Sequence, residues 1–146
     1  MGHPFKLYNT LSRTIEDFTP VEEGKISLYV CGMTVYDHCH VGHARAMVTF
    51  DTFVRYLRHR NWDVTFVRNF TDVDDKIIAR AAETGEEPIE LAERYIDAFH
   101  ADAKGLGLLM PDAEPRVSSS IQDIQNLIGK LMDQGYAYVE DGNVWF

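Results

Sequence analysis

The amino-acid sequence predicts an α/β fold in which helices flank a parallel sheet. Two hydrophobic runs, residues 26–31 and 64–70, have the β-branched and aromatic composition of buried strands. Between them, from Ala44 to about His59, apolar residues recur at the three- and four-residue spacing of a helix with one buried face. A strand, a helix and a second strand within 45 residues form a βαβ unit, which favours parallel strands.

Two further helices are predicted after the second strand. Thr71 and Asp74 suit a capping box at the start of the first helix, and Asp72 adds negative charge to its first turn. This helix is expected to end near residue 83. The second helix is expected over residues 88–105, because a proline stands at its first position and apolar residues recur at helical spacing.

The C-terminal part of the chain is expected to be organised separately. Residues 111–115 are bounded by two prolines and predict a linker. We therefore divide the chain into residues 1–110 and 111–146. In the second part, Ser119 predicts the capped start of a helix, and Asp141-Gly142 predicts the turn of a hairpin. Near the N-terminus, a short edge strand is expected before a polar stretch without regular structure.

Composition argues against several classes of protein. The 146 residues carry 14 basic and 23 acidic side chains, a formal net charge of −9, which argues against a surface dedicated to the nucleic-acid backbone. Only two cysteines occur, eight residues apart, so a reducing compartment is expected. No run approaches the ~18 apolar residues of a membrane span, and residues 1–6 contain no apolar signal core. We expect a cytoplasmic protein with no membrane association and no protein partner.

The segment between the first strand and the following helix contains the most informative residues. Both cysteines and three of the six histidines fall within residues 29–43. A strand, a turn containing Gly32 and Thr34, and a helix start together predict a nucleotide phosphate site, because unpaired N–H groups at a helix N-terminus attract anions. Gly42 permits close approach of a ligand, and His40 and His43, three residues apart, can face one site. Imidazole N–H groups there can stabilise a phosphoryl group during transfer.

Each group of residues also has a plain structural interpretation. Cys31 ends a strand, where α/β sheets place their ligands, but a free cysteine is often a small buried hydrophobe. The acidic residues at 72, 74 and 75 suit a substrate ammonium or a nucleotide-bound Mg²⁺, and equally helix capping. A self-contained zinc site is not expected, because structural zinc sites use two separated ligand pairs. The residues that could compose such a site are Cys31, His38, Cys39, His40 and His43.

Three segments resemble the N-terminal part of the cysteinyl-tRNA synthetases, a class I aminoacyl-tRNA synthetase family. They are residues 29–45, 67–78 and 110–116. The family signature known as HIGH corresponds here to His40-Val41-Gly42-His43, in which valine keeps the β-branched character of isoleucine. The resemblance implies a Rossmann-like parallel sheet with flanking helices. It makes residues 1–110 the N-terminal half of a nucleotide-binding catalytic domain and residues 111–146 the start of an inserted connective segment.

The resemblance also implies a reaction. ATP, with Mg²⁺, and L-cysteine form cysteinyl adenylate, and the cysteinyl group then moves to tRNA(Cys). His40 and His43 would contact the ATP phosphates, Gly42 would make room for the nucleotide, and Cys31 matches the first ligand of a Zn²⁺ ion that binds the substrate thiolate. Because a hydroxyl is a poorer zinc ligand than a thiol, the metal would reject serine. The residues that resemble the lining of the amino-acid pocket are Thr71, Asp72 and Asp74.

Other parts of the family pattern are expected beyond residue 146. They are the remaining zinc ligands, the lysine-rich KMSKS loop and the region that recognises the anticodon. We therefore expect the 146-residue chain to be inactive alone. Two alternatives remain open. One is a cysteine ligase that acts on an amino sugar in thiol biosynthesis, and the other is a non-catalytic nucleotide-binding module.

Overall fold

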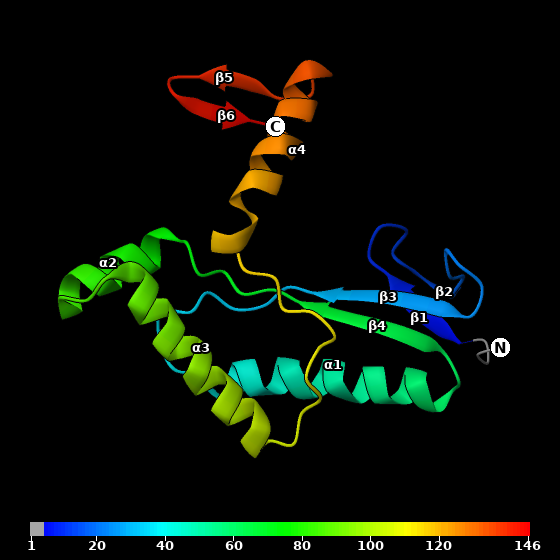
Figure 1. Cartoon of the computed structure of the whole chain (residues 1–146). Coiled ribbons are helices and arrows are strands. Elements are labelled where there is room, and N and C mark those ends of the chain that lie inside the picture. Colours follow the sequence, from blue (N-terminus) through cyan, green and yellow to red (C-terminus); the bar gives the residue numbers. More distant parts are fainter. Residues whose placement is uncertain (1–4) are drawn as a thin grey trace.

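The computed structural model describes residues 5–146; residues 1–4, on which the expectation of no signal peptide partly rests, lie outside the described residues. The predicted βαβ unit is present. Strand β3 (Lys25–Val30) leads through helix α1 (Val41–His59) to strand β4 (Asp63–Arg68). The two strands pair in parallel along their whole length, and α1 runs beneath them (Figure 1).

Helix α1 packs on β3 and β4 through its apolar face. Val54 and Leu57 are fully buried, and they form one cluster with Ile26, Val64 and Phe66 of the two strands. Successive side chains of a strand point to opposite faces, so residues 64 and 66 share the face that α1 covers. This packing places the N-terminus of α1 near the carboxyl ends of both strands.

A third extended segment runs beside β4. The N–H groups of Arg68 and Phe70 donate to the carbonyl oxygens of Ala113 and Pro115 over 3.1 and 2.9 Å. The stretch expected as a linker therefore widens the parallel sheet. Because proline lacks the N–H donor of a central strand, it occurs mainly at sheet edges, and its presence led to the linker prediction. The division at residue 110 stays a proposal, and these bonds favour a boundary a few residues later.

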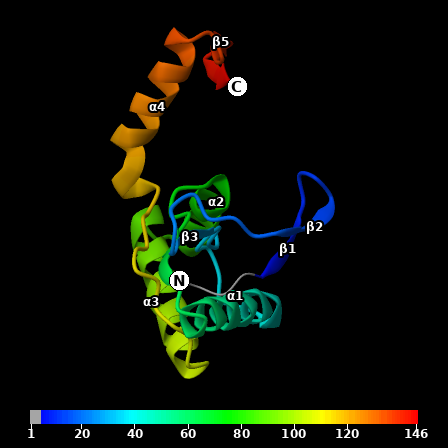
Figure 2. The ribbon, with the colours of Figure 1, turned by 90° about the vertical axis from the view of Figure 1, so that its right-hand side faces the viewer.

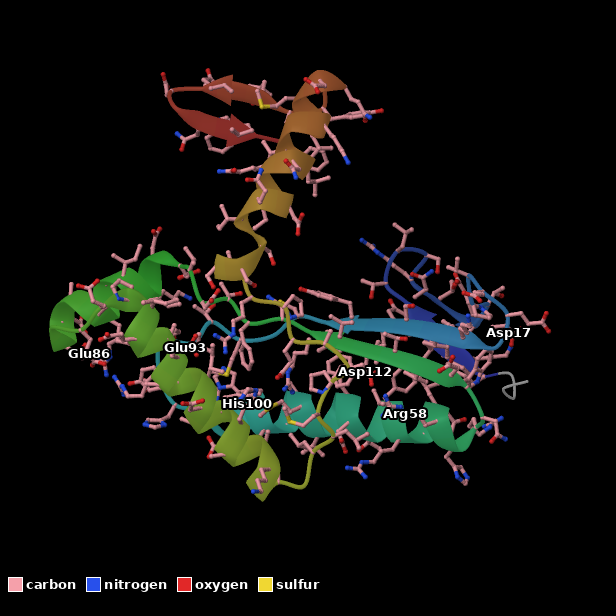
Figure 3. All side chains as sticks on the ribbon, viewed as in Figure 1. Asp17, Arg58, Glu86, Glu93, His100 and Asp112 are labelled. Carbon is pink, nitrogen blue, oxygen red and sulfur yellow. The ribbon has the colours of Figure 1, made fainter. Side chains whose placement is uncertain are left out.

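Asp112 joins this third segment to strand β4 and to helix α1. Its Oδ2 accepts from the Phe66 N–H over 2.7 Å and from Arg58 Nη2 of α1 over 3.0 Å (Figure 3). The side chain of Asp112 therefore connects strand, helix and edge segment at one point.

Helices α2 (Asp75–Thr84) and α3 (Pro88–Gly105) form the second cluster of the core. The expected capping box of Thr71 with Asp74 is wrong. Asp74 is the N-cap residue, and its side chain accepts from the Lys76 N–H over 2.9 Å. Thr71 instead extends the strand pairing, because its N–H donates to the Met33 carbonyl over 3.1 Å.

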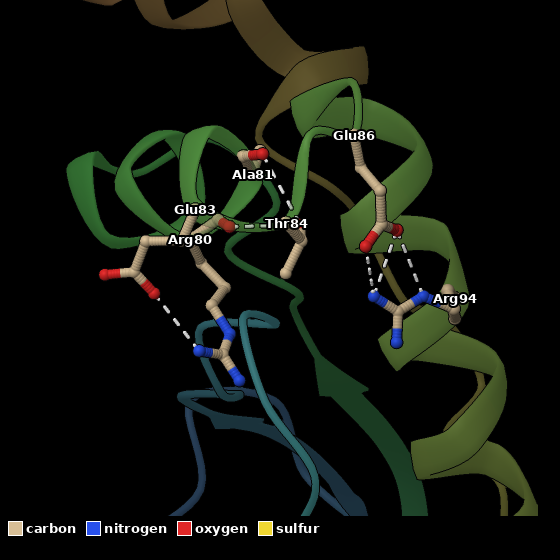
Figure 4. A network of polar contacts seen from close by, with 6 residues as sticks. All are labelled: Arg80, Ala81, Glu83, Thr84, Glu86 and Arg94. Carbon is tan, nitrogen blue, oxygen red and sulfur yellow. Dashed lines mark hydrogen bonds and ion pairs between the residues drawn. The ribbon is translucent and has the colours of Figure 1, made fainter.

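The link between α2 and α3 is held by polar contacts (Figure 4). Thr84 Oγ1 donates to the Arg80 carbonyl over 3.1 Å, which closes the last turn of α2. Gly85 follows with a φ of 71°, the left-handed conformation of many helix ends. Glu86 then pairs with Arg94 of α3 at 2.9 Å.

None of the described helices is long and apolar enough to cross a membrane.

A hairpin precedes the βαβ unit. Strand β1 (Lys6–Asn9) pairs antiparallel with β2 (Thr14–Asp17). The second strand lies in the polar stretch where no regular element was expected. All residues of both strands are exposed, so the alternation of buried and exposed side chains that predicts strands is missing.

The C-terminal elements stand apart from the body of the molecule. Helix α4 (Ile121–Asp133) projects from the end of the third segment, and the hairpin of β5 (Tyr138–Glu140) and β6 (Asn143–Trp145) lies against its far end (Figures 1 and 2). The turn prediction is confirmed, because Asp141 and Gly142 have φ values of 50° and 78°, as a type I′ turn requires.

The predicted capping role of Ser119 is wrong. Residues Ser118–Ser120 form a turn of 3₁₀-helix, and Ser120 precedes α4 without a side-chain cap. The hydroxyl of Ser119 donates to the Arg116 carbonyl over 3.1 Å. Three consecutive serines make the cap position ambiguous from the sequence, since each has the same local hydrogen-bonding capacity.

Candidate nucleotide site

A cavity of about 310 Å³ opens at the carboxyl ends of β3 and β4, beside the first three turns of α1. Four of the predicted site residues line it, namely Cys31, Gly32, Thr34 and His43. Its remaining wall is largely apolar. The other lining residues are Val30, Met33, Tyr36, Ala46, Met47, Phe50, Asp51, Phe66, Arg68, Lys76, Phe99, Leu108 and Leu109.

Gly32 is required by the close approach of the two strand ends. Its N–H donates to Asn69 Oδ1 over 2.7 Å. A Cβ at this position would lie 1.6 Å from the Asn69 carbonyl oxygen, a distance that no side chain can occupy. The absence of a side chain thus lets the segment after β3 rest on the end of β4. Two residues after Gly32, Thr34 pairs with Thr71 and continues the parallel ladder.

His40 and His43 lie together at the start of α1. Their ring centroids are 4.0 Å apart, and the rings are tilted by 39°. The helix begins at Val41, three residues before the predicted start, because His40 acts as its N-cap residue. Histidine is not among the preferred N-cap residues, so this start was not recognisable from the sequence.

The two histidines cap the helix reciprocally. Nδ1 of His40 accepts from the Gly42 N–H over 2.9 Å, and Nδ1 of His43 accepts from the His40 N–H over 3.2 Å. The N–H groups of His43 and Ala44 reach the His40 carbonyl over 2.9 and 3.2 Å. The amides of Gly42, His43 and Ala44 therefore have partners within the chain, which corrects the expectation that they are unpaired.

Gly42 has a local steric role in this arrangement. A Cβ there would lie 2.6 Å from Cε1 and 2.9 Å from Nδ1 of His40. The glycine therefore makes room for the His40 ring, which lies over the helix start. Its expected contact with a nucleotide stays a prediction.

The surroundings of His43 favour its neutral form. Partial burial lowers the pKa of His43, and the neighbouring His40 lowers it further, since a second positive charge beside it would be repelled. Burial raises the pKa of the Cys39 thiol, which lies 3.5 Å from the Met33 sulfur. Cys39 therefore stays a protonated, weakly reactive thiol, whereas Cys31 is exposed at the cavity.

Asp72 and Asp74, which follow β4, bind protein groups. Asp72 is 3% exposed, and its oxygens accept from the N–H of Ser118 over 3.0 Å and from the Ser118 hydroxyl. Asp74 caps α2. Among the described residues, Thr71, Asp72 and Asp74 are not part of the cavity wall. The structural interpretation of this acidic group is therefore the one that the contacts support, and its role toward an amino acid stays a prediction.

Three charged residues in the cavity wall were missed from the sequence, namely Asp51, Lys76 and Arg68. Asp51 pairs with Arg55 and accepts from the Leu109 N–H over 2.7 Å. Lys76 lies in the first turn of α2, with its ammonium 5.7 Å from the centre of the Tyr36 ring. Arg68 is 6% exposed, pairs with Glu114, and lies 4.6 Å from the centre of the Phe99 ring. Lys76 belongs to the segment with the family resemblance, which was a usable signal. The burial of Arg68 depends on α3 and was not visible locally.

The described residues do not complete a metal centre. No group of three or more histidine, cysteine or acidic side chains within residues 5–146 is arranged to hold a metal ion. Cys31 points its sulfur at the Gly32 carbonyl, 3.6 Å away. One thiol is too few for the four-coordinate geometry of zinc, and we assign no chemical step to zinc in this chain.

Comparison with solved structures defines the class of the fold. Mycobacterium tuberculosis methionyl-tRNA synthetase in complex with methionyl-adenylate has a TM-score of 0.69 and 24% identity, covering 78% of this chain and 23% of that one. Agrobacterium radiobacter K84 LeuRS, in a ternary complex with tRNA, has a TM-score of 0.69 and 23% identity, covering 82% and 16%. The chain therefore shares its fold with a part of each of these two synthetases.

The sequence comparison identifies the family more narrowly. Residues 17–146 match the family model described as the tRNA synthetases class I (C) catalytic domain, and the chain belongs to this family. The cysteine–tRNA ligase of Alkalilimnicola ehrlichii is 55% identical over 141 residues, and that of Methylococcus capsulatus is 54% identical over 142. These matches cover 96% and 97% of this chain, which spans about 30% of the length of each relative.

Proposed function

We propose that the full-length protein containing this chain activates L-cysteine with ATP and transfers the cysteinyl group to tRNA(Cys). The observation that carries the proposal is the shared cavity. Cys31, Gly32, Thr34 and His43 come from the segment between β3 and α1 and line one hollow at the carboxyl ends of parallel strands, which is where α/β sheets bind nucleotides. The relatives named as cysteine–tRNA ligases support the choice of amino acid.

The sheet belongs to this proposal as well. We propose that β3, β4 and the segment after Pro111 form part of a larger, Rossmann-like parallel sheet in the full-length protein. The β4 edge of the present pair of strands fits that arrangement, because it already pairs with a parallel neighbour through Ala113 and Pro115. The unpaired state of both cysteines agrees with a reducing compartment, and we propose the cytoplasm.

His40 and His43 are the proposed contacts of the ATP phosphates, which carry Mg²⁺ in solution. Attack of the cysteine carboxylate on the α-phosphorus forms the adenylate and releases pyrophosphate, so negative charge develops on the phosphate oxygens. Ring N–H donors positioned before the reaction stabilise that charge without reorganisation. The Lys76 ammonium in the same cavity wall adds a positive charge. Gly42 contributes by leaving space for the His40 ring.

Cys31 is the proposed contact for the substrate side chain. Its exposed sulfur lies in the cavity wall. We propose that it is one zinc ligand in the full-length protein and that residues outside 1–146 supply the others. Metal analysis tests this assignment directly: full-length protein with Cys31→Ser should lose bound zinc, and Cys39→Ser should retain it.

The function is tested by cysteine-dependent exchange between ATP and pyrophosphate. The full-length protein should catalyse exchange with cysteine and not with serine. We propose that the 146-residue chain alone is inactive, because it spans about 30% of its relatives. Absence of exchange in the full-length protein would contradict the proposal. Robust exchange by the chain alone would show that the remaining region is not needed for activation.

The acceptor is tested separately once adenylate forms. Addition of tRNA(Cys) should consume the adenylate, whereas an amino sugar should leave it unchanged. The opposite result would identify a cysteine ligase of thiol biosynthesis. Binding of ATP with no adenylate at all would identify a nucleotide-binding module without catalysis.

A further inference from the structure

In both His40 and His43, the Nδ1 atom of the ring accepts a hydrogen bond from a backbone N–H. Nδ1 of His40 accepts from Gly42, and Nδ1 of His43 accepts from the N–H of His40. A ring nitrogen that accepts a hydrogen bond carries no proton, and a neutral imidazole has only one. In each ring the proton must therefore lie on Nε2.

We propose that this reciprocal box fixes His40 and His43 as neutral Nε2–H tautomers, so that the pair offers ring donors, and no free ring acceptor, to an anionic ligand group. His43 lines the cavity, and the His40 ring lies 4.0 Å from it, so both rings act at one place. The tautomer is a property of this chain alone. The identity of the anion as an ATP phosphate rests on the proposed function.

Gly42 is a positioning residue in this arrangement. Its N–H is the donor that holds the His40 ring, and its lack of a Cβ allows that ring to lie 2.6 Å from where the Cβ would stand. A larger residue would push the ring away from the amide. The histidine would then be free to adopt either tautomer.

The choice of histidine as a cap also has an electrostatic reason. Aspartate is a stronger N-cap residue, but its charge would oppose phosphate at the same helix end. No acidic residue lies in the first turn of α1. A neutral imidazole satisfies the helix N–H with one nitrogen and keeps a donor on the other, so capping does not remove the attraction for an anion.

The tautomers are measurable by long-range ¹H–¹⁵N correlation spectra of the 146-residue chain. At a pH well above 6.5, both rings should show an unprotonated Nδ1 and a protonated Nε2. The exposed His59 at the other end of α1 serves as an internal reference and should show shifts averaged between tautomers. Averaged shifts at His40 and His43 equal to those of His59, or a protonated Nδ1, would overturn the proposal.

Two variants distinguish an effect of the capping box on the tautomers from a general change in helix stability. Gly42→Ala should move the His40 shifts toward the averaged values of His59, although alanine is the better helix former. His40→Asn retains a capping oxygen and should leave the His43 ring locked, since the His43 ring is held by a backbone N–H. If Gly42→Ala left the His40 tautomer unchanged, the positioning role of Gly42 would be refuted.

An activity measurement tests the ligand and keeps the two proposals distinguishable. In the full-length protein, His40→Asn should lower the rate of cysteine-dependent exchange about a hundredfold at saturating substrate, and His59→Asn should not change it. Loss of only ATP affinity in His40→Asn would overturn the assignment of a donor to the reacting phosphate. Locked tautomers in a protein without any exchange would refute the proposed function and leave the tautomer assignment standing.

Discussion

At the scale of single residues, two glycines shape this site because they lack a side chain. Gly32 and Gly42 each lie against another group at less than contact distance for a Cβ, but the opposing groups differ. At Gly32 the opposing group is a backbone carbonyl held in the sheet. At Gly42 it is the movable ring of His40. Replacement of Gly32 should therefore have a different effect from replacement of Gly42.

Gly32→Ala should destabilise the chain by at least about 3 kcal/mol, because neither strand end can move away without breaking ladder hydrogen bonds. Urea denaturation measures the free energy of unfolding. Gly129→Ala is the matched control. It lies in α4 with no atom within 4 Å of the added Cβ, and it should stabilise that helix by up to about 1 kcal/mol. Equal effects of both substitutions would refute the close approach at Gly32.

His43 should make stability depend on pH. Its folded pKa is lowered below 6.5 by burial and by His40, so the unfolded chain takes up its proton first as the pH falls. The contribution is complete above pH 6.5 and is lost as the pH falls through the folded pKa. Urea denaturation midpoints measured above pH 6.5 and at lower pH test this loss of stability.

His43→Gln provides the matched comparison for this pH effect. Glutamine keeps an acceptor for the capping box and does not titrate, so the variant should lose less stability on acidification than the original chain. Identical pH dependence in both proteins would show that His43 does not respond to its surroundings as the contacts indicate.

At the level of elements, a buried ion pair joins β4 to the third segment, and its carboxylate also contacts α3. Glu114 of the third segment accepts from Arg68 of β4, and its other oxygen lies 2.8 Å from Nε2 of His100 on α3. The side chains of Arg68 and Glu114 are only 7% and 17% exposed. Arg116 and Glu93 form a comparable pair nearby, but their side chains are 32% and 48% exposed.

Glu114→Gln should cost about 3 kcal/mol or more, because it leaves the buried Arg68 guanidinium without its counter-charge. Glu93→Gln removes a partner from the more exposed pair and should cost no more than about 1 kcal/mol. Thermal or urea unfolding of both variants measures the difference. Similar small effects would mean that water or another group compensates Arg68.

Elements with an apolar stripe or a clear turn signal were predictable, whereas β2 and the third segment were not. Helices α1 and α3 bury an apolar stripe, so their spacing is visible in the sequence. Strand β2 is exposed throughout, and the third segment gains its structure from hydrogen bonds to β4. Neither property leaves a local pattern. The start of α1 was misplaced because two histidines replace the usual capping residues.

The candidate site was predictable in composition and not in geometry. The spacing of His40 and His43 indicated that the two rings can face one site, and their centroids are 4.0 Å apart. It did not show that the histidines occupy the helix amides themselves, nor that Asp72 is buried against Ser118. Those contacts depend on ring orientation and on a segment 46 residues away in the chain.

At the scale of the whole molecule, stability is unevenly distributed. Helix α4 has 13 residues and none is buried, whereas β4 and α3 together carry eight of the 17 buried apolar residues in the described part of the chain. Isolated helices of about 12–15 residues are marginal in water. We therefore expect amides of α4 and the β5–β6 hairpin to exchange with solvent deuterium well before those of β4. Hydrogen-exchange mass spectrometry of the 146-residue chain measures this, and equal protection of α4 and β4 would contradict it.

The central claim is that the cavity at the ends of β3 and β4 holds the reacting adenylate. The most direct test is a crystal structure of the full-length protein with a sulfamoyl analogue of cysteinyl adenylate. Our account predicts the sulfamate within hydrogen-bond distance of the His43 imidazole and the cysteine side chain beside Cys31. An analogue bound elsewhere in the protein, with this cavity filled by side chains, would contradict the account.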